Sequence, residues 1–207
     1  MILKLSFSAL LLFILISLDV IFDGLLTKID DFIFPYVLSL QTLILNKIFL
    51  YITTLGNMPF IVGFSIIITI ILWFKKDYLS IKFFISSVIG SSILMFGIKE
   101  LIGRLRPQNF VADMFQQGNS FPSGHATLSM TLSLALFFII YPQLVSKISK
   151  NIIIIILATF ALLVSFSRIY FGVHYFSDVA GGLTLSIFWV LLMVWTFKLK
   201  YFIPSKN

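Results

Sequence analysis

The chain has 207 residues, of which 59% are hydrophobic and only 11% are charged. Soluble domains usually carry about 25% charged residues, so this composition excludes an ordinary soluble protein and predicts a membrane protein. Despite a net charge of +7, no dense basic run suggests a nucleic-acid partner, and the lack of cysteine excludes disulfides, thiolate zinc sites and cysteine nucleophiles.

Six apolar stretches are long enough for membrane helices, which need about 20 residues, with a range of roughly 17–25. In chain order, we predict spans over residues 5–22, 58–74, 78–98, 126–141, 151–167 and 179–197. The first stretch lacks a small-residue cleavage site, so we expect an uncleaved span and not a signal peptide. The short linkers and the lack of repeats predict one all-α, membrane-embedded domain over residues 1–207.

The segment 27–57 mixes polar residues such as Asp30 and Gln41 with apolar ones such as Phe32 and Leu45. This mixture suits an amphipathic helix lying at the membrane interface. An ordinary loop leading into the second span is an equally good interpretation.

The distribution of positive charge predicts the orientation, because cytoplasmic loops are enriched in lysine and arginine. With the N-terminus inside, the cytoplasmic side holds Lys4, Lys75, Lys76, Lys82, Lys147, Lys150, Lys198, Lys200 and Lys206. Nearly all acidic residues then lie outside. We therefore expect both termini in the cytoplasm and residues 99–125 and 168–178 on the outer face, which in a bacterium is the periplasmic or extracellular side of the plasma membrane.

Ionisable side chains at membrane depth are costly and mark functional sites. Here they gather at the outer ends of the last four spans. Lys99, Arg106 and Arg168 provide three cations, and arginine suits bidentate contact with phosphate oxygens. Ser123 and Gly124 precede a predicted helix, whose N-terminus offers free N–H groups to an anion. The set predicts a phosphate site built without a metal.

The two histidines of the chain lie in the same region. His174 and Asp178 are four residues apart and would face the same way on a helix. A carboxylate on one imidazole nitrogen fixes the tautomer and leaves the other nitrogen as nucleophile or base. His125 could then protonate the leaving oxygen. We predict in-line phosphoryl transfer to His174, followed by hydrolysis of the phosphohistidine.

Three motifs resemble those of the type 2 phosphatidic acid phosphatase (PAP2) superfamily. They are K-x6-RP at residues 99–107, PSGH at 122–125 and SR-x5-H-x3-D at 167–178. The resemblance implies an all-α core like that of acid phosphatases and vanadium haloperoxidases. It implies in addition that the reaction of this chain needs neither a metal nor a cofactor. It also implies that His174 is the nucleophile, Asp178 its orienting partner and His125 the general acid. The implied phosphate-binding set is Lys99, Arg106, Ser123, Gly124 and Arg168.

The expected substrate is a membrane lipid with a phosphate or diphosphate head group. Short bacterial PAP2 members of this layout resemble phosphatidylglycerophosphatases and undecaprenyl pyrophosphate phosphatases. Phosphatidic acid, diacylglycerol pyrophosphate and the phosphates of lipid A are further candidates. The loop 108–121 has an interfacial composition that suits access from the outer leaflet. We expect Arg104, which lies outside the motifs, to contact lipid head groups at the rim.

Two other classes of function stay open. A lipid transporter could use the three cations to bind a head group, although that role does not require His174 and Asp178 at their spacing. A catalytically inactive receptor or scaffold with a PAP2 fold would have lost a motif residue, and none is lost. We infer no obligate protein partner.

Overall fold

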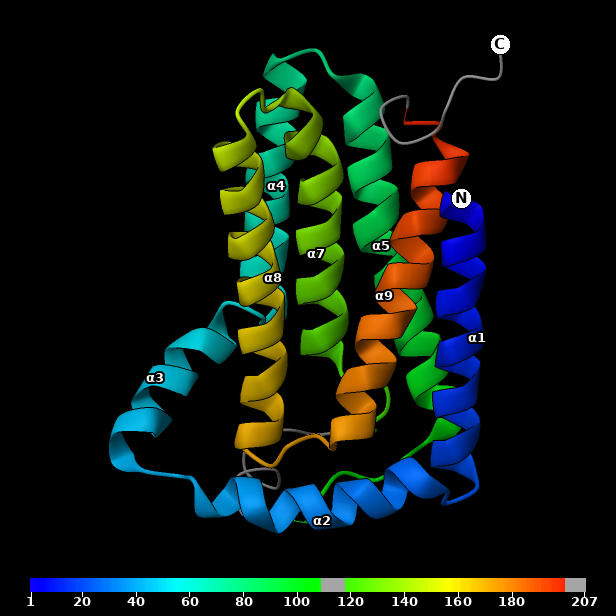
Figure 1. Cartoon of the computed structure of the whole chain (residues 1–207), viewed down its shortest axis with the longest axis vertical. Coiled ribbons are helices and arrows are strands. Elements are labelled where there is room, and N and C mark those ends of the chain that lie inside the picture. Colours follow the sequence, from blue (N-terminus) through cyan, green and yellow to red (C-terminus); the bar gives the residue numbers. More distant parts are fainter. Residues whose placement is uncertain (109–117, 200–207) are drawn as a thin grey trace.

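The computed structural model describes residues 1–108 and 118–199, and the regular elements in these ranges are helices (Figure 1). This confirms the all-α prediction. The interfacial loop residues 110–117, Lys200 and Lys206 lie outside the described residues. The elements are α1 (Ile2–Ile21), α2 (Leu25–Ser39), α3 (Leu43–Thr54), α4 (Met58–Phe74), α5 (Tyr78–Ile102), α7 (Gly124–Ile140), η1 (Tyr141–Gln143), α8 (Lys147–Tyr170) and α9 (Phe176–Thr196).

Each predicted span coincides with a helix. Helices α1, α5, α8 and α9, and α7 together with η1, are long and apolar enough to cross a membrane. Helix α4 is equally apolar but has only 17 residues. Helices α5 and α8 continue past the predicted span ends, which places Lys99 and Arg168 in their last turns. The predicted ends were too early because backbone hydrogen bonding continues where the side chains stop being apolar.

The segment that leads into α4 is helical, so the loop interpretation of residues 27–57 is wrong. Helices α2 and α3 meet at a bend of 119°. Figure 1 shows α2 running crosswise along one end of the bundle, below α8 and α9, while α3 rises from it toward α4. Helix α2 exposes Leu25, Phe32 and Tyr36 but buries Asp30 and Val37. Its sidedness is that of an amphipathic helix with one buried carboxylate.

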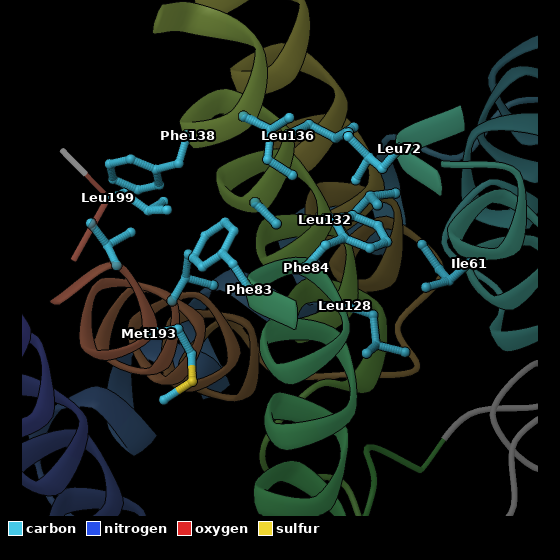
Figure 2. Packing of buried hydrophobic residues seen from close by; sticks show 14 of the residues in the cluster. Ile61, Leu72, Phe83, Phe84, Leu128, Leu132, Leu136, Phe138, Met193 and Leu199 are labelled. Atoms are coloured by element: carbon cyan, nitrogen blue, oxygen red, sulfur yellow. The ribbon is translucent and has the colours of Figure 1, made fainter. Parts of the chain in front are cut away.

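The core lies among α4, α5, α7 and α9. Phe83 and Phe84 of α5 are fully buried and pack with Leu132 of α7 and Met193 of α9 (Figure 2). Helix α7 is the most enclosed of the candidate spans. In a bilayer the lipid tails are as apolar as the core, so close packing of complementary shapes holds such helices together. The enclosed α7 gives the residues at its N-terminus a rigid support.

Two glycines bring α9 close to the start of α7. A Cβ atom on Gly182 would lie 2.8 Å from the Ser123 carbonyl oxygen and 2.9 Å from Thr127 Oγ1, and one on Gly181 would lie 2.5 Å from the Phe121 ring. Small residues permit such close approach of membrane helices. As a result the Ser123 amide donates to the Asp178 carbonyl oxygen at 3.0 Å, which places two motifs side by side.

Candidate active site

The predicted site residues gather at the end of the bundle crossed by α2. Lys99 and Arg168 lie in the last turns of α5 and α8, His125 and Asp178 in the first turns of α7 and α9, and Arg106 in the segment after α5. Ser123 and Gly124 lie at the start of α7. Three motifs that are separate in the sequence therefore form one cluster.

His174 does not lie on a helix as predicted. It belongs to the connection between α8 and α9, because α9 begins only at Phe176. The pairing with Asp178 nevertheless forms, because Asp178 Oδ2 accepts the Tyr175 amide at 2.9 Å and lies 3.3 Å from His174 Nδ1. A carboxylate in the first turn commonly caps a helix in this way. Capping of α9, and not a shared helix face, brings the two side chains together.

The imidazole of His174 is enclosed, with 2% of the residue exposed. Its Nε2 atom lies 3.1 Å from Arg106 Nη1, and the same Nη1 donates to the Val173 carbonyl oxygen at 2.9 Å. Ser120 Oγ approaches Nδ1 at 3.2 Å and also donates to Asp178 Oδ2. Nothing in the motifs pointed to Ser120. The ring is thus held from both nitrogen atoms.

Protonation of His174 is disfavoured by its surroundings. Burial lowers the pKa of the imidazole to about 3, although the hydrogen bond and negative charge of Asp178 act in the opposite direction. Burial likewise lowers the pKa of the Arg106 guanidinium, again opposed by Asp178. Desolvation penalises the charged form of a base. His174 is therefore a neutral imidazole at neutral pH.

Arg168 is buried with donors that have no partner in the described part of the chain. Its Nη1 donates to Thr53 Oγ1 at 2.6 Å, but within the described ranges Nε and Nη2 have no acceptor, although the residue is only 3% exposed. Ser123 Oγ is also buried without a partner in the described part of the chain. Buried polar groups are normally satisfied, so such groups call for an explanation. A phosphate bound among them would supply the missing acceptors.

Lys99 and His125 have protein partners. Lys99 Nζ donates to the carbonyl oxygens of Asn119 and Ser120 at 2.7 and 3.2 Å. His125 Nε2 lies 2.7 Å from Asn57 Oδ1, at the start of α4. Sequence reasoning missed Asn57, as it missed Thr53 beside Arg168. Isolated polar residues near apolar helices were their only signal.

From the sequence we expected Arg104 to contact lipid head groups at the rim. In the structure its side chain points inward instead. Its Nη1 donates to Asp178 Oδ1 at 2.7 Å, and its Nη2 donates to Asp30 Oδ2 at 2.9 Å. Its side chain is 12% exposed and both carboxylates are fully buried. Two buried anions hold the guanidinium inward because an unpaired buried charge is costly.

The described residues contain no group of three or more His, Asp or Glu side chains that could hold a metal ion. The polar groups at the cluster are instead mostly donors from arginine, lysine and serine. Such a set is suited to binding an oxyanion directly.

The model of the PAP2 superfamily matches residues 81–202, which is more than half of the chain. The chain belongs to the PAP2 superfamily. It is 31% identical over 183 residues to phosphatidylglycerophosphatase B of Bacillus subtilis (strain 168), a match covering 86% of this chain and 88% of that protein. PAP2 membership and this relative identify it as a phosphatase.

Solved structures agree with the PAP2 assignment. A crystal structure of a transmembrane PAP2-type phosphatidylglycerolphosphate phosphatase from Bacillus subtilis matches with a TM-score of 0.84 and 27% identity, covering 96% of this chain and 99% of that chain. Aquifex aeolicus LpxE matches with a TM-score of 0.62 and 24% identity over 78% of this chain and 92% of that chain, which shows a shared fold alone. The helices and the transmembrane PAP2 match make this an integral membrane protein.

Proposed function

We propose that this PAP2 enzyme hydrolyses the phosphate or diphosphate head group of a membrane lipid through a phosphohistidine on His174. The tautomer of His174 carries the proposal. The Asp178 carboxylate on Nδ1 can only accept a hydrogen bond, and the Arg106 guanidinium on Nε2 can only donate one. The neutral ring therefore has its proton on Nδ1 and a lone pair on Nε2, the form that a nucleophile requires.

In the first step, the Nε2 lone pair attacks phosphorus while the bond between phosphorus and the leaving oxygen breaks. His125, in its protonated form, gives a proton to that oxygen. The ring of His174 gains positive charge, which Asp178 stabilises from Nδ1. Arg106 Nη1 lies against His174 Nε2, where phosphorus has to arrive. Nη1 must therefore shift from Nε2 to a phosphate oxygen.

In the second step, His125 accepts a proton from water as the water oxygen attacks the phosphohistidine. The bond between phosphorus and Nε2 breaks, and the electron pair returns to the ring. Charge on the equatorial oxygens would be stabilised by Arg168, Arg106 and Lys99. Nε and Nη2 of Arg168 and Oγ of Ser123, which have no partner among residues 1–108 and 118–199, support this assignment.

Phosphatidylglycerol phosphate is the first candidate substrate, because the B. subtilis relative named for it aligns along 88% of its length. Undecaprenyl diphosphate and phosphatidic acid contain the same reacting group and belong in the same assay. The likeness to LpxE, at 24% identity, gives no reason to prefer its substrate. A non-catalytic head-group carrier would not need the arrangement around His174.

We also propose that the site opens on the outer face and that both termini are cytoplasmic. The structure describes most of the lysines that we assign to the cytoplasm. They lie on or beside the N-terminus of α1, the connections α4–α5 and α7–α8, and the C-terminus of α9. Figure 1 places these points at the opposite end of the bundle from α2. The positive-inside rule supports this orientation.

The test is phosphate release from these lipids by the purified protein in detergent, with EDTA present. We expect His174→Ala to lower kcat on the order of 10³-fold or more, because the attacking atom is removed. A radiolabelled phosphoenzyme, stable in alkali and labile in acid, should form in the wild-type protein and not in the variant. Wild-type activity in a folded His174→Ala variant would refute the nucleophile, and activity that EDTA abolishes and a divalent ion restores would refute a metal-free site.

A further inference from the structure

We propose that Asp30 and Arg104 are positioning residues, which hold the Asp178 carboxylate in the orientation that His174 requires. The proposal rests on the phosphohistidine mechanism above. Asp30 belongs to α2 and lies outside the region matched by the family model, residues 81–202. A crosswise helix at the end of the bundle would thereby contribute to catalysis without touching the phosphate.

Arg104 connects the two carboxylates. Nη1 donates to Asp178 Oδ1 at 2.7 Å and to Ser177 Oγ at 2.6 Å, while Nη2 donates to Asp30 Oδ2 at 2.9 Å. The guanidinium also lies 4.2 Å from the centre of the Tyr175 ring. A planar guanidinium presents its donors in a rigid arrangement, so it can fix two acceptors relative to each other.

Asp30 makes a second connection to the same helix terminus. Its Oδ1 accepts the Ser177 amide at 2.9 Å, and its Oδ2 accepts the Ser177 hydroxyl. Asp30 is 1% exposed and Ser177 is fully buried. A carboxylate at a helix N-terminus satisfies free N–H groups and complements the helix dipole. Asp30 therefore seats α2 against the first turn of α9, where Asp178 lies.

These contacts divide the two oxygens of Asp178 between two tasks. Oδ1 is taken by Arg104, while Oδ2 faces His174 Nδ1 and accepts from Ser120 Oγ and the Tyr175 amide. Without Arg104, Oδ1 would lose its donor among the described residues, and only the contacts to Oδ2 would hold the plane of the carboxylate. Partners that orient the ligands of metal ions account for about 10–100-fold of activity, and we expect an effect of similar size here.

Charge gives Asp30 a role of its own. A lone arginine on Asp178 would neutralise the charge that stabilises the developing imidazolium of His174. Asp30 compensates for Arg104, so that the three groups together keep one negative charge. Burial alone would lower the pKa of the Arg104 guanidinium, but Asp178 and Asp30 outweigh burial and raise the pKa. The guanidinium therefore stays charged between its two carboxylates.

The test compares Arg104→Gln and Asp30→Asn with Asp31→Asn, a matched control that removes the neighbouring exposed carboxylate of α2. We expect the first two variants to lower kcat about 10–100-fold with KM within about twofold of wild type. Asp31→Asn should leave both constants unchanged. Because Lys offers one point charge and no fork, Arg104→Lys should restore only part of the lost kcat.

A double-variant comparison separates positioning from mere support of the fold. If Arg104 acts through Asp178, Arg104→Gln should change kcat less than about twofold when Asp178→Asn is already present. The proposal would be overturned if Arg104→Gln lowered kcat equally with and without Asp178→Asn. It would also be overturned if Arg104→Gln and Asp30→Asn had the same kcat as the Asp31→Asn control. His174→Ala is assayed alongside. If that variant remains active, the phosphohistidine mechanism fails; if it is inactive while Arg104→Gln and Asp30→Asn match the control, only the positioning role fails.

Discussion

The imidazole of His174 lies between one group that can only accept a hydrogen bond and one that can only donate. Asp178 faces Nδ1 at 3.3 Å and Arg106 faces Nε2 at 3.1 Å. This arrangement determines the tautomer without reference to any hydrogen position. His174 is only 2% exposed. In the mechanism that we propose, a substrate oxygen replaces Nε2 of His174 as the acceptor of Arg106 Nη1, and this frees Nε2 to attack.

The burial of His174 predicts a specific pH dependence of stability. The folded-state pKa is lowered to about 3, whereas an unfolded histidine has a pKa of about 6.5. Between these values the unfolded state binds more protons, so stability contributed by the neutral ring falls as the pH drops below about 6.5. We expect the wild-type Tm in detergent to decrease more from pH 7 to pH 5 than that of His174→Gln.

The wild-type protein and the His174→Gln variant share His125 and the acidic residues. The difference between their changes in Tm therefore isolates the contribution of His174. Equal decreases in Tm would show that the ring titrates in the folded state much as it does in the unfolded one. That result would contradict a neutral, buried imidazole.

At the scale of elements, the glycines near the starts of α7 and α9 differ in whether packing requires them. Gly182 leaves room for the Ser123 carbonyl oxygen and the Thr127 hydroxyl, and a Cβ atom there would be too close to both. At Gly124 a Cβ atom would only touch the Met95 side chain, at 3.6 and 3.7 Å. The protein has space for a larger residue at Gly124, so the glycine there is not required for packing.

We therefore expect Gly124→Ala to keep or slightly raise Tm, because alanine is the better helix former by about 1 kcal/mol within a helix. Its KM should rise about tenfold, since a Cβ atom would hinder the approach of phosphate to the first turn of α7. Gly182→Ala is the matched control for packing and should lower Tm. A KM for Gly124→Ala equal to that of wild type would contradict phosphate binding at this turn.

The segment before α4 supplies partners to three site residues. Asp30 of α2 pairs with Arg104, Thr53 of α3 accepts from Arg168, and Asn57 lies against His125. Helices α2 and α3 are short and expose large apolar residues, yet they enclose the site from outside the motif region. Their polar contacts indicate that the first 57 residues shape the site as well as the membrane contact.

At the scale of the molecule, the two ends of the bundle differ in charge and in structure. One end is crossed by α2 and carries the site. The opposite end carries the lysines of the α4–α5 connection and of the first turn of α8 (Figure 1). Because the chain contains no cysteine, single cysteines can report the side on which each end lies.

We expect Lys28→Cys, on α2, to react with a membrane-impermeant thiol reagent in intact cells or spheroplasts. Lys75→Cys, beyond α4, should react only after lysis. Both lysines are exposed, so a difference in labelling reports sidedness and not burial. The reverse pattern would place the site on the cytoplasmic side.

Much of this protein could be predicted from its sequence. Long apolar stretches predicted the helices, because a membrane span must satisfy its backbone internally. The spacing of the ionisable residues predicted which side chains meet, because three motifs at one end of a bundle must lie together. Helix boundaries were less accurate, and His174 was wrongly placed on a helix, because capping by Asp178 depends on local geometry that hydropathy does not encode.

The residues that contact the site residues from other helices were identified only from the tertiary structure. Asp30 and Arg104 are 74 residues apart, Asn57 and His125 are 68 apart, and Thr53 and Arg168 are 115 apart. Sequence periodicity describes one element at a time, whereas these contacts depend on how α2, α3 and α4 pack against the bundle. The local pattern of the sequence thus determined which residues we propose for the site, whereas the packing of distant helices decided how these residues are oriented.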